Sequence, residues 1–166
     1  MADQQARILV VDDDRLILAM LTDMLAPEYE VVTAADGARG LQALEAQPFA
    51  AILCDQHMPG LSGVEVLERA ITLQPDAARI LVTATDEVKT VAEATNVARV
   101  HRVVVKPVRQ VEIKGILKGA LREISLEAEN RRLLEELRAR ERELEHELTL
   151  RNEELREAMR RLAGTE

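Results

Sequence analysis

A short apolar run that ends on an acid constrains the fold more than any other stretch. Residues 51–54 are apolar, Asp55 follows them directly, and Pro59 and Gly60 form a turn signal soon after. A continuous apolar run bounded by turn residues is typical of a strand that is buried on both faces of a parallel sheet. Such a strand ends at the carboxyl edge of the sheet, where open α/β folds bind ligands. Because an isolated buried carboxylate is costly, the sequence predicts a partner for Asp55.

Strand-like runs alternate with helical patterns through the first 110 residues. The other predicted strands are residues 8–11, 29–34, 79–83 and 100–105. Apolar residues at helical spacing mark residues 15–26 and 63–74, a stretch around Leu41 and Leu44 that ends before Pro48, and a weaker stretch at 86–94. This alternation predicts βαβ units, and therefore an α/β fold with a doubly wound parallel sheet.

The last third of the chain has a different composition. Residues 120–163 contain neither Gly nor Pro and are rich in Glu, Arg and Leu. Apolar residues recur there at alternating three- and four-residue steps, at Leu134, Leu137, Leu144, Leu148, Leu155, Ala158 and Leu162. This spacing predicts a left-handed coiled coil within a long C-terminal helix that starts near Val108. We expect a stutter near residues 130–133, and Glu141 and Arg151, which occupy seam positions, should weaken or steer the pairing.

Composition narrows the class of protein. The net charge of -8 argues against direct binding to nucleic acid or to an anionic membrane. Tyr29 and Phe49 are the only aromatic residues, so bases have almost no platform on which to stack. A single cysteine, Cys54, is typical of a reducing compartment, and neither a leader nor an apolar run of about 18 residues occurs. We therefore expect a cytoplasmic protein that does not associate with membranes.

Four of the five predicted strands end on polar side chains. Asp12 and Asp13 follow the first strand, Asp55 ends the third, Thr83 ends the fourth and Lys106 follows the fifth. Because the carboxyl ends of parallel strands lie at one edge, these groups should converge. Clustered carboxylates favour a hard cation such as Mg²⁺, which is commonly completed by phosphate. With a lysine and a hydroxyl nearby, the sequence predicts phosphoryl transfer onto a carboxylate.

The motifs at these strand ends resemble the receiver domain of two-component response regulators. The resemblance covers about residues 6 to 120 and is carried by residues 8–14, 55–59 with Gly63, 83–84 and 106–107. It implies a flavodoxin-like (βα)5 fold with strand order 2-1-3-4-5. It also implies that Asp55 is the phosphoacceptor and that Thr83 and Lys106 bind the phosphoryl oxygens. The implied Mg²⁺ ligands are Asp13, Asp55, the backbone carbonyl of His57 and, through water, Asp12.

The resemblance also implies an organisation for the whole chain. We expect a receiver domain at residues 1–120 and a coiled-coil dimerisation and signalling helix at residues 121–166. The implied function is that of a phosphorelay response regulator, with a histidine kinase or phosphotransfer protein as phosphodonor. Its chemistry would be limited to self-phosphorylation and autodephosphorylation. We expect a parallel homodimer, because parallel helices place both receivers at one end. The Lys106-Pro107 bond is expected to be cis.

Several alternatives remain open on the sequence alone. Val103 stands where the family commonly has Tyr or Phe, which favours a constitutive coiled-coil scaffold with a docked receiver, although the complete acidic pocket disfavours it. The chain can equally be the N-terminal part of a longer regulator whose output domain is absent. A haloacid-dehalogenase-type phosphatase is disfavoured because His57 stands where that family has its second acid. The leucine seam can also dock as a single helix on another partner.

A few residues have plainer interpretations. Asp14 and Asp36 are candidate helix caps, and Cys54 is expected to be inert core. His101 is expected at the surface without a metal. His146 resembles the start of the phosphoacceptor box of histidine-kinase helices, but no proline follows it, so a solvated residue is the favoured interpretation.

Overall fold

The computed structural model describes residues 5–84, 96 and 98–164. Five parallel strands form one sheet, as the alternating pattern predicted, and their order β2-β1-β3-β4-β5 is the one that the family resemblance implied. Their bounds are β1 (Arg7–Val11), β2 (Glu30–Ala34), β3 (Ala51–Asp55), β4 (Ala78–Thr83) and β5 (Arg102–Val105). The predicted strands match these within one or two residues. The weak helix predicted at 86–94 lies outside the described residues.

Four helices are described, and each begins and ends close to its predicted position. They are α1 (Arg15–Leu25), α2 (Gly37–Ala46), α3 (Gly63–Leu73) and α5 (Gln110–Ala163). Asp14 and Asp36 are N-caps of α1 and α2, as predicted, because their carboxylates accept backbone N–H groups that the first turn leaves without partners. Ser62 and Glu65 form a capping box at the start of α3.

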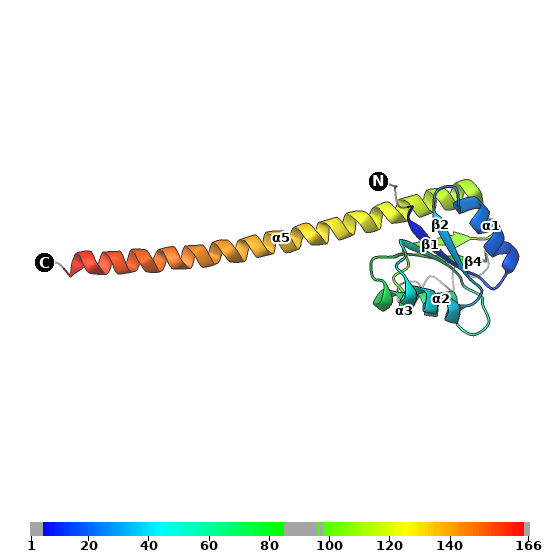
Figure 1. Ribbon diagram of the computed structural model, residues 1–166, viewed down its shortest axis with the longest axis horizontal. Helices are drawn as coiled ribbons and strands as arrows, with labels where there is room; N and C mark the ends of the chain where they lie inside the picture. Colours follow the sequence, from blue (N-terminus) through cyan, green and yellow to red (C-terminus); the bar gives the residue numbers. More distant parts are fainter. Residues whose placement is uncertain (1–4, 85–95, 97, 165–166) are drawn as a thin grey trace. The chain divides into compact units, whose positions relative to one another are not determined.

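The two faces of the sheet bury two separate cores. Alternate residues of each strand point to opposite faces, so Ile8 and Val10 join one core while Leu9 and Val11 join the other. One face packs against α1 and the first turns of α5, and the other against α2 and α3 (Figure 1). β3 is buried on both faces, which explains why its sequence is a continuous apolar run.

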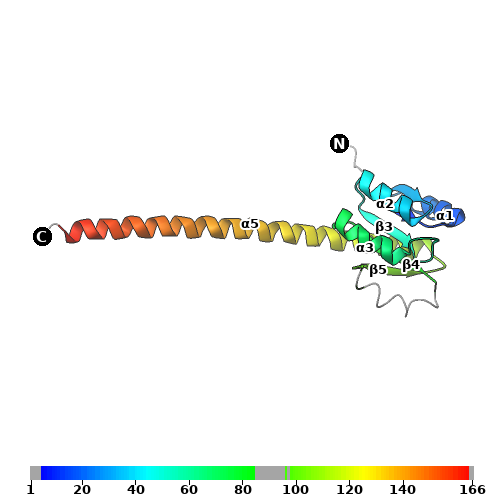
Figure 2. The ribbon, with the colours of Figure 1, turned by 90° about the horizontal axis from the view of Figure 1, so that it is seen from below.

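The chain divides into two compact units, residues 1–125 and 126–166. The first unit contains the sheet, the three shorter helices and the first turns of α5, whose Ile113, Leu117 and Ala120 are buried. The second unit is the remainder of α5, drawn from yellow to red in Figures 1 and 2, and its described side chains are exposed except for the half-buried Ala128. In the described part of the chain, no helix is long and apolar enough to cross a membrane.

The start of α3 lies against the end of β3 because residue 63 is glycine. A Cβ atom at Gly63 would lie 2.4 Å from the carbonyl oxygen of Asp55 and 2.7 Å from a methyl group of Leu81. Both distances are shorter than real Cβ contacts, and one of the two neighbours is rigid backbone. Gly63 therefore permits the close approach that fixes the end of β3.

Replacing Gly63 by alanine should lower the free energy of unfolding by about 1–3 kcal/mol, because the added methyl group overpacks this contact. The matched control is Gly119→Ala, since Gly119 has nothing within 4 Å of its Cβ position in α5. That control should instead raise stability by about 0.5–1 kcal/mol through helix propensity. Urea denaturation followed by circular dichroism measures both effects. A Gly63→Ala variant as stable as the wild type would contradict the close-approach argument.

Candidate functional site

The strand ends bring the sequence-predicted residues together at the carboxyl edge of the sheet. Val11 of β1 pairs with Cys54 of β3, so Asp12, which follows β1, lies level with Asp55, the last residue of β3. Asp12, Asp55 and Thr83 are almost completely buried. The backbone N–H of Lys106 donates to the carbonyl oxygen of Thr83 at 2.8 Å, which holds the end of β5 beside the end of β4.

Lys106 links two of the carboxylates. Its Nζ atom lies 2.7 Å from Oδ1 of Asp55 and 3.4 Å from Oδ2 of Asp12. The lysine side chain is 30% exposed, whereas the two acids are nearly inaccessible, so the ammonium group reaches inward from the rim. The predicted partner of Asp55 is thus Lys106. The contact between Lys106 and Asp12 was not predicted from the sequence, because no local pattern indicates it.

The pKa values of these groups reflect a crowded acidic edge. Burial raises the pKa of Asp12, and the charge of Asp55 raises it further, while the hydrogen bond from the Asp14 N–H and the ammonium of Lys106 oppose the rise. Burial alone would lower the pKa of Lys106, but its hydrogen bond with Asp55 and the charges of both acids outweigh burial, so that pKa is raised. Lys106 is therefore held as a cation.

The loop after β3 is fixed by backbone and amide hydrogen bonds. The N–H of His57 donates to Oδ2 of Asp55 at 3.1 Å, so the second carboxylate oxygen also has a partner. The side-chain oxygen of Gln56 accepts the N–H of Val64, and its carbonyl oxygen accepts the N–H of Gly63 at 3.1 Å. Gln56 was missed by the sequence analysis, although it anchors the loop that carries His57. The Lys106-Pro107 bond is cis, as expected.

Three carboxylates at this edge can hold a metal ion. Oxygen atoms of Asp12, Asp13 and Asp55 all lie within 4.8 Å of one another. Asp12 and Asp55 are buried, whereas Asp13 is exposed and leaves one side of the cluster open to water. A set of carboxylate oxygens with access to water fits a hard divalent cation.

The predictions for residues outside the site can also be compared with the structure. Cys54 is free and buried, and burial raises the pKa of its thiol, in keeping with an inert core residue. Val103 is 37% exposed on β5.

The prediction of a surface position for His101 needs correction. Its side chain is half-buried, and its Nδ1 atom accepts the backbone N–H of Arg79 at 2.9 Å, because the ring lies beside the first residues of β4. His146 is exposed, as predicted.

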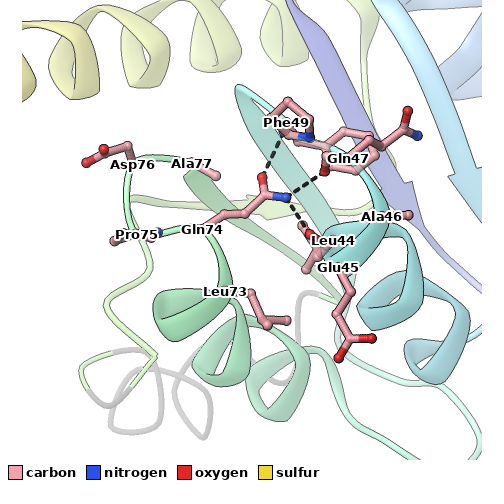
Figure 3. A pocket seen from close by; sticks show the side chains of 11 residues that line it. Leu44, Glu45, Ala46, Gln47, Phe49, Leu73, Gln74, Pro75, Asp76 and Ala77 are labelled. Carbon is pink, nitrogen blue, oxygen red and sulfur yellow. Dashed lines mark hydrogen bonds between the residues drawn. The ribbon is translucent and has the colours of Figure 1, made fainter.

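A hollow lies at the opposite edge of the sheet, where β3 and β4 begin. It measures about 430 Å³ and is lined by the loops before these two strands (Figure 3). The side chain of Gln74 crosses it. Its amide nitrogen donates to the carbonyl oxygens of Leu44 and Gln47, and its oxygen accepts the N–H of Phe49. All three contacts are satisfied within the chain, so we assign this glutamine a structural role.

The strand order and the charged edge are those of a doubly wound α/β domain, a fold class whose ligand sites lie where the strands end. The sequence profile of the response regulator receiver domain matches residues 8–118. The chain belongs to the response regulator receiver domain family.

Relatives and solved structures agree with this assignment. The hydrogenase transcriptional regulatory protein HoxA of Cupriavidus necator is 37% identical over 139 residues, which cover 76% of this chain and 28% of that protein. The HoxA protein of Bradyrhizobium diazoefficiens is 31% identical over 125 residues, covering 75% and 26% respectively. This chain thus spans about a quarter of the length of these relatives.

Among solved structures, an adenylate cyclase from Rhodopirellula baltica superposes with a TM-score of 0.74 at 31% identity, over 79% of this chain and 98% of that chain. A CheY-like receiver domain protein from Methanospirillum hungatei gives 0.70 at 33% identity, over 74% and 98%.

Replacing Lys106 by methionine should lower the free energy of unfolding at pH 7 by about 1–3 kcal/mol in the absence of metal, because the clustered acids lose their cation. A carboxyl group with a raised pKa contributes stability below its unfolded pKa and loses it as pH rises through the folded pKa. The raised pKa of Asp12 therefore makes the deficit largest at neutral pH and smaller toward pH 4. Lys118→Met, on the exposed face of α5, is the control. An equal deficit at both pH values in thermal melts would contradict this account.

Proposed function

We propose that this chain is a phosphorylation-switched response regulator and that Asp55 accepts the phosphoryl group. The observation that carries the proposal is the placement of Asp55 at the end of the central strand, 2.7 Å from Lys106 and next to two further acids. Receiver domains are phosphorylated by histidine kinases or phosphotransfer proteins, and we propose one of these as the phosphodonor. The domain proposed for this role is residues 1–120.

The transfer itself needs little beyond positioning and charge. A carboxylate oxygen of Asp55 attacks phosphorus and forms an O–P bond. The bond between phosphorus and the donor breaks, and its electron pair leaves with the donor. We propose that Lys106 then contacts a phosphoryl oxygen in place of the Asp55 oxygen, which loses its charge in the acyl phosphate product, a mixed anhydride. Thr83, at the end of β4, is proposed as the hydroxyl donor to a second phosphoryl oxygen.

We propose Mg²⁺ as the cation of this edge. Asp13 and Asp55 would bind it directly together with the backbone carbonyl of His57, and Asp12 would act through water. When bound, the ion offsets negative charge on the incoming phosphoryl group. The open side at Asp13 suits an ion that keeps several waters.

The remaining residues, 121–166, are proposed as a signalling helix that associates with a second copy of the chain. The leucines of the seam are exposed along this helix, and an apolar stripe of this length is rarely left in water even where two charged residues interrupt it. Because the chain spans only about a quarter of its curated relatives, an output domain beyond the helix is a second proposal. A constitutive scaffold remains the competing function, and phosphorylation of Asp55 separates the two.

Incubation with acetyl phosphate and Mg²⁺ should add one phosphate to the wild-type chain, measured by intact mass. Asp55→Asn should abolish the addition, because an amide is a poor nucleophile toward phosphorus. Asp23→Asn, an exposed acid of α1, is the matched control and should label like the wild type. Undiminished labelling of Asp55→Asn would refute the assignment, and an unlabelled wild type would favour the scaffold.

Asp13→Ala should lose Mg²⁺ binding and phosphorylation together, because too few hard ligands remain for a cation that dehydrates reluctantly. Mg²⁺ should raise the melting temperature of the wild type but not of this variant, by the linkage of binding to folding. Asp13 is exposed, so the metal-free variant should melt close to the metal-free wild type. Wild-type Mg²⁺ affinity in Asp13→Ala, measured by calorimetry, would exclude Asp13 as a ligand.

A further inference from the structure

We infer that the leucine seam pairs with a second copy in the antiparallel direction, in a register centred on His146 that places Glu141 opposite Arg151 of the partner subunit. This inference rests on the self-association proposed above and specifies its geometry. It replaces the parallel orientation expected from the sequence, which followed from how a signal would be transmitted rather than from any side chain.

The two charged seam residues have no partner within their own helix. Other charges of the second unit do: Arg132 lies 3.6 Å from Glu136, and Arg161 lies 3.6 Å from Glu157, each pair four residues apart. Across the described residues, neither Glu141 nor Arg151 makes an ion pair. Both lie in the row of exposed leucines, so any helix that covers these leucines must also cover a glutamate and an arginine.

The spacing of the seam decides which residues meet. The seam residues at heptad position a are 134, 141, 148, 155 and 162. Those at heptad position d are 137, 144, 151 and 158. In an antiparallel pair centred on residue 146, residues 134, 141, 148 and 155 face residues 158, 151, 144 and 137 of the partner subunit, and Leu162 faces Asn130 of the partner subunit. Leu144 then faces Leu148 of the partner subunit, and Leu137 faces Leu155 of the partner subunit. Glu141 faces Arg151 of the partner subunit, and the two-fold symmetry repeats each of these layers.

A parallel, in-register pair has better apolar layers but worse charged ones. Each leucine would stack on its own copy, whereas antiparallel pairing places Leu134 against Ala158 of the partner subunit and Leu162 against Asn130 of the partner subunit. However, parallel pairing also stacks Glu141 on Glu141 of the partner subunit, and likewise Arg151 on its copy. Like charges that are partly desolvated at the seam repel strongly, whereas the antiparallel arrangement turns both layers into ion pairs.

The charged seam residues specify the register of the helix pair as well as its direction. A shift by one heptad toward one end would place Glu141 opposite Leu144 of the partner subunit, and a shift toward the other end would place it opposite Ala158 of the partner subunit. Either shift leaves four charged groups against apolar side chains. The register centred on residue 146 is the one that pairs every seam charge.

The flanking charges have a smaller effect. Near the midpoint, Glu145 and Glu147 each approach their own copies in the antiparallel pair, which is unfavourable, while Arg140 approaches Glu154 of the partner subunit. These side chains flank the seam and stay in contact with water, so solvent and salt screen their interactions. The charges inside the seam therefore decide the direction.

Charge reversal tests the inference on the full chain. Glu141→Arg should weaken dimerisation at least about 10-fold in sedimentation equilibrium, because both mixed layers become arginine on arginine, and Arg151→Glu should do likewise. The double variant E141R/R151E should return to within about 3-fold of the wild type, since the ion pairs are rebuilt with reversed polarity. Glu153→Arg, on the outer face of the helix, is the matched control and should dimerise like the wild type. In a parallel pair, Glu141→Arg would exchange one like-charge layer for another and change little.

Disulfide cross-linking gives an independent readout. Glu141→Cys alone should form no cross-link, because antiparallel copies of residue 141 are ten residues apart along the axis, or about 15 Å, beyond the reach of a disulfide. A mixture of Glu141→Cys and Arg151→Cys chains should cross-link under mild oxidation. The native Cys54 is buried and remains in all variants, with the wild type as the control for it.

The outcomes separate the two proposals. A wild-type chain that is monomeric at tens of micromolar would overturn the self-association and with it this inference. A dimer in which Glu141→Cys cross-links to itself, or in which Glu141→Arg has no effect, would overturn the antiparallel orientation alone. Acetyl phosphate labelling of Asp55 in each variant verifies that the receiver domain is intact.

Discussion

The ammonium group of Lys106 is the interaction on which the functional edge of this domain depends. Four strands converge there, and three of the side chains that they deliver are acids within 4.8 Å of one another. Such a cluster is unfavourable in a folded protein unless positive charge accompanies it. Lys106 contacts Asp55 and Asp12 from the end of β5. The last strand of the chain therefore supplies the positive charge that the acids after β1 and at the end of β3 require.

Much of this arrangement could be predicted from sequence patterns, because the patterns record burial. The doubly buried β3 appears as a continuous apolar run, and the polar residues after each strand mark the carboxyl edge. The predicted bounds of the elements differ from the observed ones by one or two residues, because the final turn of a helix or the end of a strand has no sharp sequence signal. The caps at Asp14 and Asp36 were predicted correctly because their cause is local.

Individual side-chain hydrogen bonds to backbone groups of other elements could not be predicted in this way. The half-buried ring of His101, which accepts a backbone N–H of β4, had been expected at the surface. The three hydrogen bonds of Gln74 and the anchoring of the loop by Gln56 had no signal at all. Each depends on the direction of one side chain toward a backbone group of another element, between 8 and 30 residues away. A local pattern of apolar and polar residues does not contain that direction.

Helix α5 carries two different apolar faces in succession. Ile113, Leu117 and Ala120 are fully buried in the core of the sheet, whereas the leucines beyond residue 126 are exposed. The helix is therefore not a detachable tail: its first turns are part of the receiver. Recombination between regulators that joined a new segment before Ala120 would remove core residues along with the old output. An exchange after Ser125 would leave the receiver whole, so this point is the natural joint at which evolution, or an engineer, can attach a different output.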